Sequence, residues 1–397
     1  MARVSQSHLK ILIVALLALL ILGAEQALLG IYIAERTIDA TGFAASTNYG
    51  GTFFALHAAG AALTIVLSML PALSGATTLI VRLALICLGV GLITLTISDH
   101  WLLDLCASFM MGLGFGGINL GFNGFIVQNF QKYRMLLLNK LNAAFGIGAV
   151  LAPSLLVIES VSTGHIFAVT GALALVLLVG VTNLDSNGDG GTASAAMRAR
   201  TAINWRHWAP AALVAALVLG LAVEISLIAW LPTVLHNWGM SNAQVAELMA
   251  RYFVCFLGAR VLATLISQRV SASALVAIGV LGTAAVLMLV TIGMLEHASV
   301  VIAGGFVALL FPNLFGFAAD KLGNSHRGNA VLMLAGLGGA MIGPWLVGLL
   351  ASIWPSLGLG LILAMLSLTA MLFVIAVLMS TVHVGASDTQ LYPTNDH

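Results

Sequence analysis

Four ionisable residues stand inside long apolar stretches of the sequence, where they could carry a proton or a charge. Glu25 and His57 lie in the first two stretches, and Glu224 and Arg251 lie in two stretches of the second half. An ionised side chain near the centre of a bilayer costs about 2.5–3.5 kcal/mol on insertion scales, so such residues are candidates for function. Each half of the chain therefore offers one acid and one base.

The expected depths pair these residues within each half. At 1.5 Å per residue, Glu25 and His57 both lie roughly 10 Å below the outer face, and Glu224 and Arg251 reach similar depths. We therefore predict that each acid contacts its base. A carboxylate beside a cation stays ionised, whereas one alone in an apolar site prefers its neutral form, and a proton-coupled carrier could switch between the two. The alternatives are a purely structural ion pair for Glu224 and Arg251 and an interhelical hydrogen bond for His57.

Four amides and one indole extend the set of candidates for binding a solute or for coupling. The amides are Gln26, Asn119, Asn123 and Asn313, and the indole belongs to Trp230. Amides both donate and accept hydrogen bonds, which suits hydroxylated or amide-bearing solutes, although they could equally bond between helices. The indole could stack on a sugar face, gate a cavity, or lie in an interfacial aromatic belt.

The composition shows which elements must hold these residues. Of 397 residues, 60% are hydrophobic and 7% are charged, against about 25% charged in soluble domains. Apolar runs of about 20 residues without strict alternation favour membrane-spanning helices and exclude a β-barrel. We predict an all-α membrane protein with twelve transmembrane helices. Their expected ranges are 11–34, 49–70, 78–97, 102–127, 136–158, 164–183, 208–235, 244–267, 272–294, 298–319, 328–351 and 357–382.

The basic residues gather on one side of this arrangement, which predicts that both termini are cytoplasmic. That side carries Arg3, Lys10, Lys132, Arg134, Lys140, Arg198, Arg200, Arg206, Arg260, Arg269, Lys321 and Arg327. The opposite loops carry Glu35, Asp39, Asp99, Glu159 and Glu296, with Arg36 as their one clear base. We expect an integral protein of the bacterial inner (plasma) membrane.

The two halves of the chain resemble each other. Gly148 to Pro153 has its counterpart in Gly339 to Pro344, and Glu25 corresponds to Glu224. A polar stretch over residues 185–207 separates the halves and reads as a flexible cytoplasmic linker. We expect two pseudo-symmetric six-helix bundles, at residues 1–184 and 208–397 with a short tail, and a site at their interface.

Four stretches carry a more specific resemblance. They are Gly112-Leu113-Gly114 through Asn123, Gly146-Ile147-Gly148-Ala149 to Pro153, Glu224 with Trp230-Leu231-Pro232, and Phe311-Pro312 with Ala318-Ala319-Asp320. Over nearly its whole length the chain resembles the fucose–proton symporter-like branch of the major facilitator superfamily. The resemblance implies a sugar transporter that works by alternating access and proton symport.

Two departures weaken the assignment to this branch. The loop over residues 70–76 has no charge, where the superfamily usually has a G-x-x-x-D-R-x-G-R-like sequence. Asn119 stands where symporters of the branch often place a carboxylate. A proton-driven exporter of metabolites or drugs is therefore the closest alternative, supported by the charge-poor fourth helix and the glycine-proline segments. A non-transporting membrane receptor or assembly partner is a third.

The remaining sequence features predict neither an enzyme nor a cofactor. No Walker motif, metal-ligand cluster or catalytic-triad spacing is present, and the calcium-loop-like residues 185–190 lack the glutamate that should follow at position 196. Cys87, Cys106 and Cys255 lie in or beside apolar runs and are interpreted as packed thiols. The net charge of +1 gives no reason to expect nucleic acid. We expect a monomer whose partners are a small solute, protons and the lipid bilayer.

Overall fold

The structure is a computed structural model, and it describes most of the chain. The described residues are 6–38, 47–70, 73, 76–130, 133–181, 184, 208–267, 269–291, 296–321, 326–357 and 359–388. The predicted linker at residues 185–207 and the last residues of the tail lie outside this set.

Almost all of the described chain is α-helical. The long helices of the first half are α1 (Gln6–Ile38), α2 (Thr47–Ser68), α3 (Thr77–Ile97), α4 (Trp101–Asn129), α5 (Arg134–Leu155) and α6 (Thr163–Leu177). Those of the second half are α8 (Trp208–Asn237), α9 (Asn242–Ile266), α10 (Ala272–Thr291), α11 (Glu296–Val307), α12 (Leu310–Lys321), α13 (His326–Ile353) and α14 (Leu359–Asp388). Two short 3₁₀ helices, Leu178–Gly180 and Pro355–Leu357, follow α6 and α13.

The helices have the length and surface of membrane spans. Among the described residues, eleven spans are long and apolar enough to cross a bilayer, with α11 and α12 together forming one of them. The described apolar part of α14, Gly360–Ile375, is shorter. Large aliphatic side chains such as Val179, Ile97 and Leu265 are 74–88% exposed. A surface of this kind is stable only against lipid, as the hydropathy predicts.

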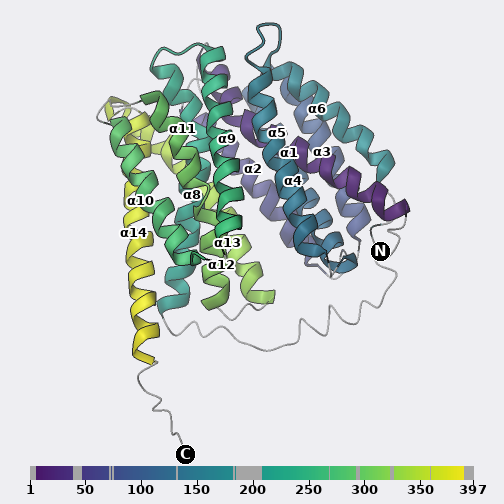
Figure 1. The fold of residues 1–397 in the computed structure, drawn as a ribbon. Helices are drawn as coiled ribbons and strands as arrows, with labels where there is room; N and C mark the ends of the chain where they lie inside the picture. The colour runs from purple at the N-terminus through teal and green to yellow at the C-terminus, as the bar shows by residue number, and fades with distance from the viewer. Residues whose placement is uncertain are drawn as a thin grey trace, which may run out of the picture.

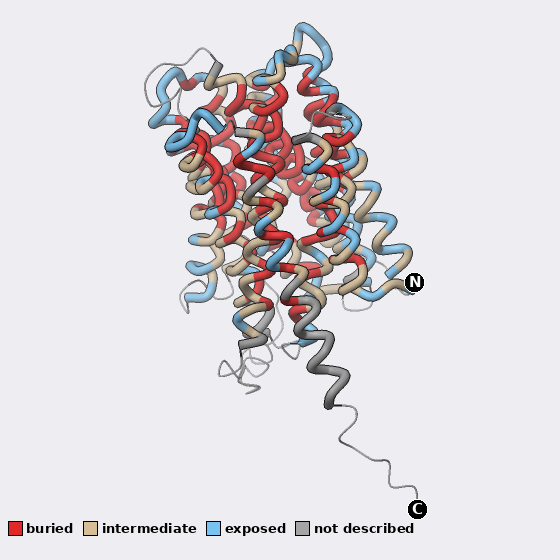
Figure 2. Tube along the Cα trace, turned by 90° about the vertical axis from the view of Figure 1, so that its left-hand side faces the viewer, coloured by how far each residue is buried: buried red, intermediate tan, exposed pale blue. Residues whose placement is uncertain are grey.

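The helices form two groups with matching internal contacts. Figure 1 shows α1–α6 on one side of the molecule and α8–α14 on the other. In the first group α1 packs on α5, α2 on α4, and α3 on α4 and α6; in the second, α8 packs on α13, α9 on α11, and α10 on α11 and α14. The groups meet where α1 contacts α8, α2 contacts α13 and α5 contacts α9. The contacts thus repeat with two-fold pseudo-symmetry, and the buried residues lie between the helices (Figure 2).

The glycine-proline segments hold equivalent helices close together. A methyl group added to Gly148 of α5 would overlap the carbonyl oxygen of Leu20 in α1. In the second half, one added to Gly339 of α13 would overlap the carbonyl oxygen of Val218 in α8. Small residues let membrane helices approach in this way. These segments therefore have a packing role in both halves.

The tenth predicted helix is broken near its middle. The sequence predicts one helix over 298–319, whereas the structure has α11 and α12 with a turn at Ala308 and Leu309 between them. Pro312 is the cause, because proline has no N–H to bond the carbonyl of residue 308 and its ring crowds that carbonyl.

The two groups are in close contact near the C-terminal ends of α1 and α8, which we call the outer ends after the orientation that the sequence predicts. Gly30 of α1 packs on the carbonyl oxygen of Ile228 in α8, a carbonyl that Pro232 leaves without its usual helical donor. Gly50 at the start of α2 packs on the ring of Trp230. A larger residue at either glycine would separate the two groups of helices.

Candidate functional site

The first buried acid–base pair joins α1 to α2. Nε2 of His57 lies 2.6 Å from Oε1 of Glu25, and the two side chains are 8% and 0% exposed. The second carboxylate oxygen, Oε2, has no hydrogen-bond partner. The contact predicted from helix depths is therefore confirmed.

The surroundings of this pair fix its geometry. A side chain at Gly112 of α4 would overlap the carbonyl oxygen of His57, so α4 crosses α2 closely at this point. The ring of Phe115, also of α4, meets the His57 ring edge-on with centroids 5.6 Å apart. A side chain at Gly23 of α1 would overlap the backbone of Phe145 in α5. Glycines near the pair thus allow α1 to approach α5 closely and α4 to approach α2 closely around it.

The second buried pair differs from the prediction. Nη2 of Arg260 donates to Oε1 of Glu224 at 2.7 Å, and the Glu224 side chain is 5% exposed. The guanidinium also lies over the ring of Phe256, 4.3 Å from its centroid. The predicted pairing of Glu224 with Arg251 is wrong, because Arg251 pairs instead with Glu247 one turn away on the exposed surface of α9.

Helical phase explains the error. Residues 251 and 260 of α9 are nine positions apart, which at about 100° per residue puts them on opposite faces of one helix. Arg260 follows the buried Tyr252 and Phe256 at intervals of four residues and faces inward. The position of a residue along a helix does not determine on which face of the helix that residue lies. We therefore leave Arg251 out of the site and include Arg260.

The two pairs differ in the base that each contains. Histidine gains and loses its proton near neutral pH, whereas the guanidinium of arginine stays charged in proteins. The base beside Glu25 is thus an imidazole, whereas the base beside Glu224 is a guanidinium with a permanent charge.

The predicted amides stand on α1, α4 and α12, and in the described part of the chain none of them is hydrogen-bonded to either ion pair. Nδ2 of Asn119 donates to the carbonyl of Phe115 at 3.0 Å, and Nδ2 of Asn313 donates to that of Leu309 at 2.7 Å, both one turn back on their own helices. Gln26 and Asn123 are half-buried.

Trp230 lies in the outer contact between the two groups of helices. It is 1% exposed, and its Nε1 donates to the carbonyl of Pro344 in α13 at 2.9 Å. This placement agrees with a gating position and does not fit an interfacial aromatic belt, whose side chains meet the headgroups.

The sequence analysis missed a third buried carboxylate. Asp104 of α4 is fully buried, and its Oδ2 accepts from Tyr49 Oη at 2.6 Å and from Arg36 Nε at 3.1 Å. Arg36 also donates to the carbonyl of Ser98 at 2.6 Å. The network ties the outer ends of α1, α2 and α4 together. Its one sequence signal was that Arg36 is the single clear base on the outer side.

Metal binding and disulfide bonding find no support in the described part of the chain. No three histidine, cysteine, aspartate or glutamate side chains there lie together as a metal site would require. Cys87, Cys106 and Cys255 are free thiols; Cys87 and Cys255 are half-buried, whereas the expected packing is wrong for Cys106, which lies on the exposed face of α4.

These features define the class of protein. Apolar helices in two pseudo-symmetric groups, with acid–base pairs buried inside them, are the construction of a polytopic membrane transporter. The family model described as Major Facilitator Superfamily matches residues 11–330. The chain belongs to this superfamily, whose members are transporters of small solutes, and it is an integral membrane protein.

Solved structures share the fold at low sequence identity. A D-xylose–proton symporter has a TM-score of 0.70 and 16% identity, with 92% of this chain and 97% of that chain covered. The nucleoside transporter NupG has a TM-score of 0.71 and 12% identity, with coverage of 94% and 98%. A bacterial homologue of the human lysosomal transporter Spinster, in an inward-facing and occupied conformation, has a TM-score of 0.67 and 13% identity, with 94% of each chain covered. No curated protein matches the sequence.

Proposed function

We propose that this protein is a secondary active transporter that moves a small polar solute by alternating access, coupled to protons through Glu25 and His57. The observation that carries the proposal is the 2.6 Å contact between these two side chains inside the bilayer-spanning helices. Buried ionisable residues of this kind mark proton relays and solute pathways in membrane proteins.

Protonation changes the strength of this contact. With one proton between them, a carboxylate and an imidazole form a short, charge-assisted hydrogen bond. A second proton neutralises the carboxylate while the imidazole stays cationic, which removes the charge attraction. Because α1 packs on α8, and α2 packs on α13, a change in the contact between α1 and α2 acts on the interface between the two groups of helices.

Hydroxylated solutes are the first class to test. The solved structures of similar fold include transporters named for xylose and for nucleosides, and half-buried amides stand on α1, α4 and α12. Amides suit hydroxyl groups because they both donate and accept hydrogen bonds. A sugar or sugar derivative is the solute that we place first.

The cellular setting follows from the loop charges. We propose the bacterial inner membrane, cytoplasmic termini, and domains at residues 1–184 and 208–397 joined by the linker, working as a monomer without nucleic acid. Lysine and arginine in the loops on one side support this orientation.

The exporter and receptor alternatives lose part of their support. The glycine-proline segments that favoured an exporter have a packing role against α1 and α8. A buried acid–histidine pair gives a receptor no evident advantage, whereas a proton-coupled carrier requires a titratable group.

Reconstituted vesicles with a trapped pH-sensitive dye test the proposal. D-xylose, D-glucose, uridine and D-glucuronate are added in turn to vesicles with and without the protein. We expect at least one of them to move protons together with itself, and the direction separates symport from exchange. Uptake of a solute with no accompanying proton movement at any imposed pH gradient would contradict proton coupling.

A further inference from the structure

The break between α11 and α12 leaves backbone groups without helical partners near the middle of a span that is long enough to cross a membrane. Ala308 lies about 17 Å along the span that starts at His297, at 1.5 Å per residue. Its carbonyl has no helical donor because Pro312 lacks an N–H, and Nε of Arg260 lies 3.5 Å from it. The next helix, α12, begins at Leu310, and because Pro312 has no N–H, the donors of its first turn are the N–H groups of Leu310 and Phe311, which have no partner within the helix.

These groups form an anion-binding arrangement. The start of a helix carries a partial positive charge and free N–H donors, and it binds carboxylates and phosphates. The backbone of Phe311, in the first turn of α12, lies near enough to the carboxylate of Glu224 to interact with its charge. Arg260 supplies the full positive charge at 2.7 Å. Glu224 is therefore the carboxylate that Arg260 and the start of α12 hold in this structure.

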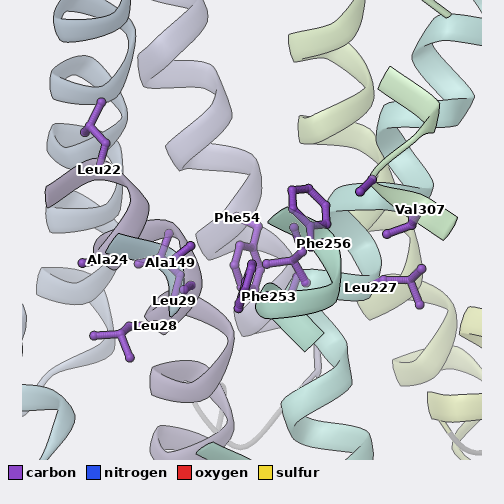
Figure 3. Close-up of a cluster of buried hydrophobic side chains, with 14 of the residues drawn as sticks. Leu22, Ala24, Leu28, Leu29, Phe54, Ala149, Leu227, Phe253, Phe256 and Val307 are labelled. Atoms are coloured by element: carbon purple, nitrogen blue, oxygen red, sulfur yellow. The ribbon is translucent and has the colours of Figure 1, made fainter. Parts of the chain in front are cut away.

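Two buried polar atoms beside the ion pair have no hydrogen-bond partner in the described part of the chain. Oε2 of Glu224 and Oη of Tyr252 are buried without hydrogen-bond partners, and the charge of Glu224 acts on Tyr252. Figure 3 shows buried apolar side chains of the same region, among them Leu227 of α8, Val307 of α11 and Phe256 of α9, whose ring lies against the guanidinium of Arg260. Burying polar atoms among apolar side chains costs free energy unless a ligand or a water molecule forms hydrogen bonds with them.

The two partners of this ion pair differ in exposure. The Arg260 side chain is 34% exposed, in contrast to 5% for Glu224. On α12, Pro312 is exposed, and Asn313 is half-buried one position further on. The guanidinium is therefore the less buried charge of the pair.

We propose that Arg260 and the start of α12 bind a carboxylate group of the transported solute, which replaces the carboxylate of Glu224. The inference rests on the proposed transport function and narrows the transported solute to an organic acid. Sugar acids are the first class to test, because their hydroxyl groups could also form hydrogen bonds with the half-buried amides. Half-helix N-termini receive anionic solute groups in other transporter folds, for the same physical reason.

The test compares acetate with acetamide, which have nearly the same shape and differ in charge. Glu224→Gln removes the internal competitor and keeps the size of the side chain. We expect acetate to raise the unfolding temperature of the purified Glu224→Gln variant saturably, at constant ionic strength. Its apparent affinity should be at least about tenfold higher than in wild type, as expected from one charge-assisted hydrogen bond. Acetamide should have no such effect.

Matched variants make the test decisive. Arg251→Gln in the Glu224→Gln background removes an arginine from the same helix but from its exposed face, and acetate binding should persist. Arg260→Gln in that background should abolish it. If Glu224→Gln fails to fold, Glu224→Asp withdraws the carboxylate by one methylene and should bind acetate more tightly than wild type. Equal acetate affinity in wild type, the Glu224 variants and the Arg260 variant overturns the inference. The assay uses neither a pH gradient nor Glu25, so its failure leaves the proton-coupling proposal standing.

Discussion

Removing one hydroxyl from the outer network should measurably destabilise the protein. Tyr49→Phe keeps the ring but deletes the donor that lies 2.6 Å from the fully buried carboxylate of Asp104. A hydrogen bond to a charged group contributes about 1.5–3 kcal/mol. The remaining bond, from Arg36, comes from a side chain that is 29% exposed and is partly screened by solvent. We therefore expect the free energy of unfolding to fall by about 1.5–3 kcal/mol.

The assay is reversible unfolding in mixed detergent micelles with increasing dodecyl sulfate, followed by circular dichroism. Thr52→Val on the same helix is the matched control, because its hydroxyl bonds only one turn back to Asn48 and its loss should change stability by less than about 0.5 kcal/mol. In an Asp104→Asn background, Tyr49→Phe should cost only about 1 kcal/mol, as for a neutral hydrogen bond. Equal losses for Tyr49→Phe and Thr52→Val would refute the reasoning.

Three further predictions follow from packing and topology. Gly148→Ala should lower the free energy of unfolding by about 1–3 kcal/mol, because the new methyl group meets a carbonyl of α1; Gly258→Ala has no atom within 4 Å of its new methyl and should be neutral or slightly stabilising in the same assay. Trp230→Phe should cost about 0.5–1.5 kcal/mol for its lost bond to α13, and unchanged unfolding would contradict a role in the outer contact. Single cysteines replacing Asp99 and Arg198 in a cysteine-free chain should react with impermeant reagents from opposite faces; labelling from the same face would refute the twelve-helix topology.

The sequence predicted those features that depend on position along a helix. Hydropathy located most of the long helices to within a few residues; the exceptions are an early start of α1, an early end of α6 at Leu177, a late end of α14 at Asp388 and the split tenth helix. Counting residues also placed Glu25 and His57 at one depth, and their contact is present. Depth along a helix was sufficient here because both side chains face the interior of the first group of helices, where they meet at the same level.

Counting positions along the helices does not predict which face of a helix points inward, nor which residues far apart in the sequence come into contact. Arg251 and Arg260 are both in α9, and only the packed structure shows which one faces Glu224. Asp104 meets Arg36 across 68 positions of sequence. Pro312 was visible in the sequence, but a proline either bends or breaks a helix depending on what satisfies the freed carbonyl. Here Arg260 lies within reach of that carbonyl.

Proton coupling through Glu25 is the central claim, and comparing net uptake with exchange tests it most directly. Glu25→Gln keeps the size and hydrogen bonding of the side chain but cannot bind or release a proton. In proteoliposomes, across about pH 5.5 to 8, a range that brackets an unperturbed histidine, the variant should lose accumulation driven by a pH gradient while solute exchange continues. Glu224→Gln measured in parallel shows whether the second carboxylate shares this role. If both variants still concentrate solute on a pH gradient, the coupling residue lies elsewhere or the carrier is not driven by protons.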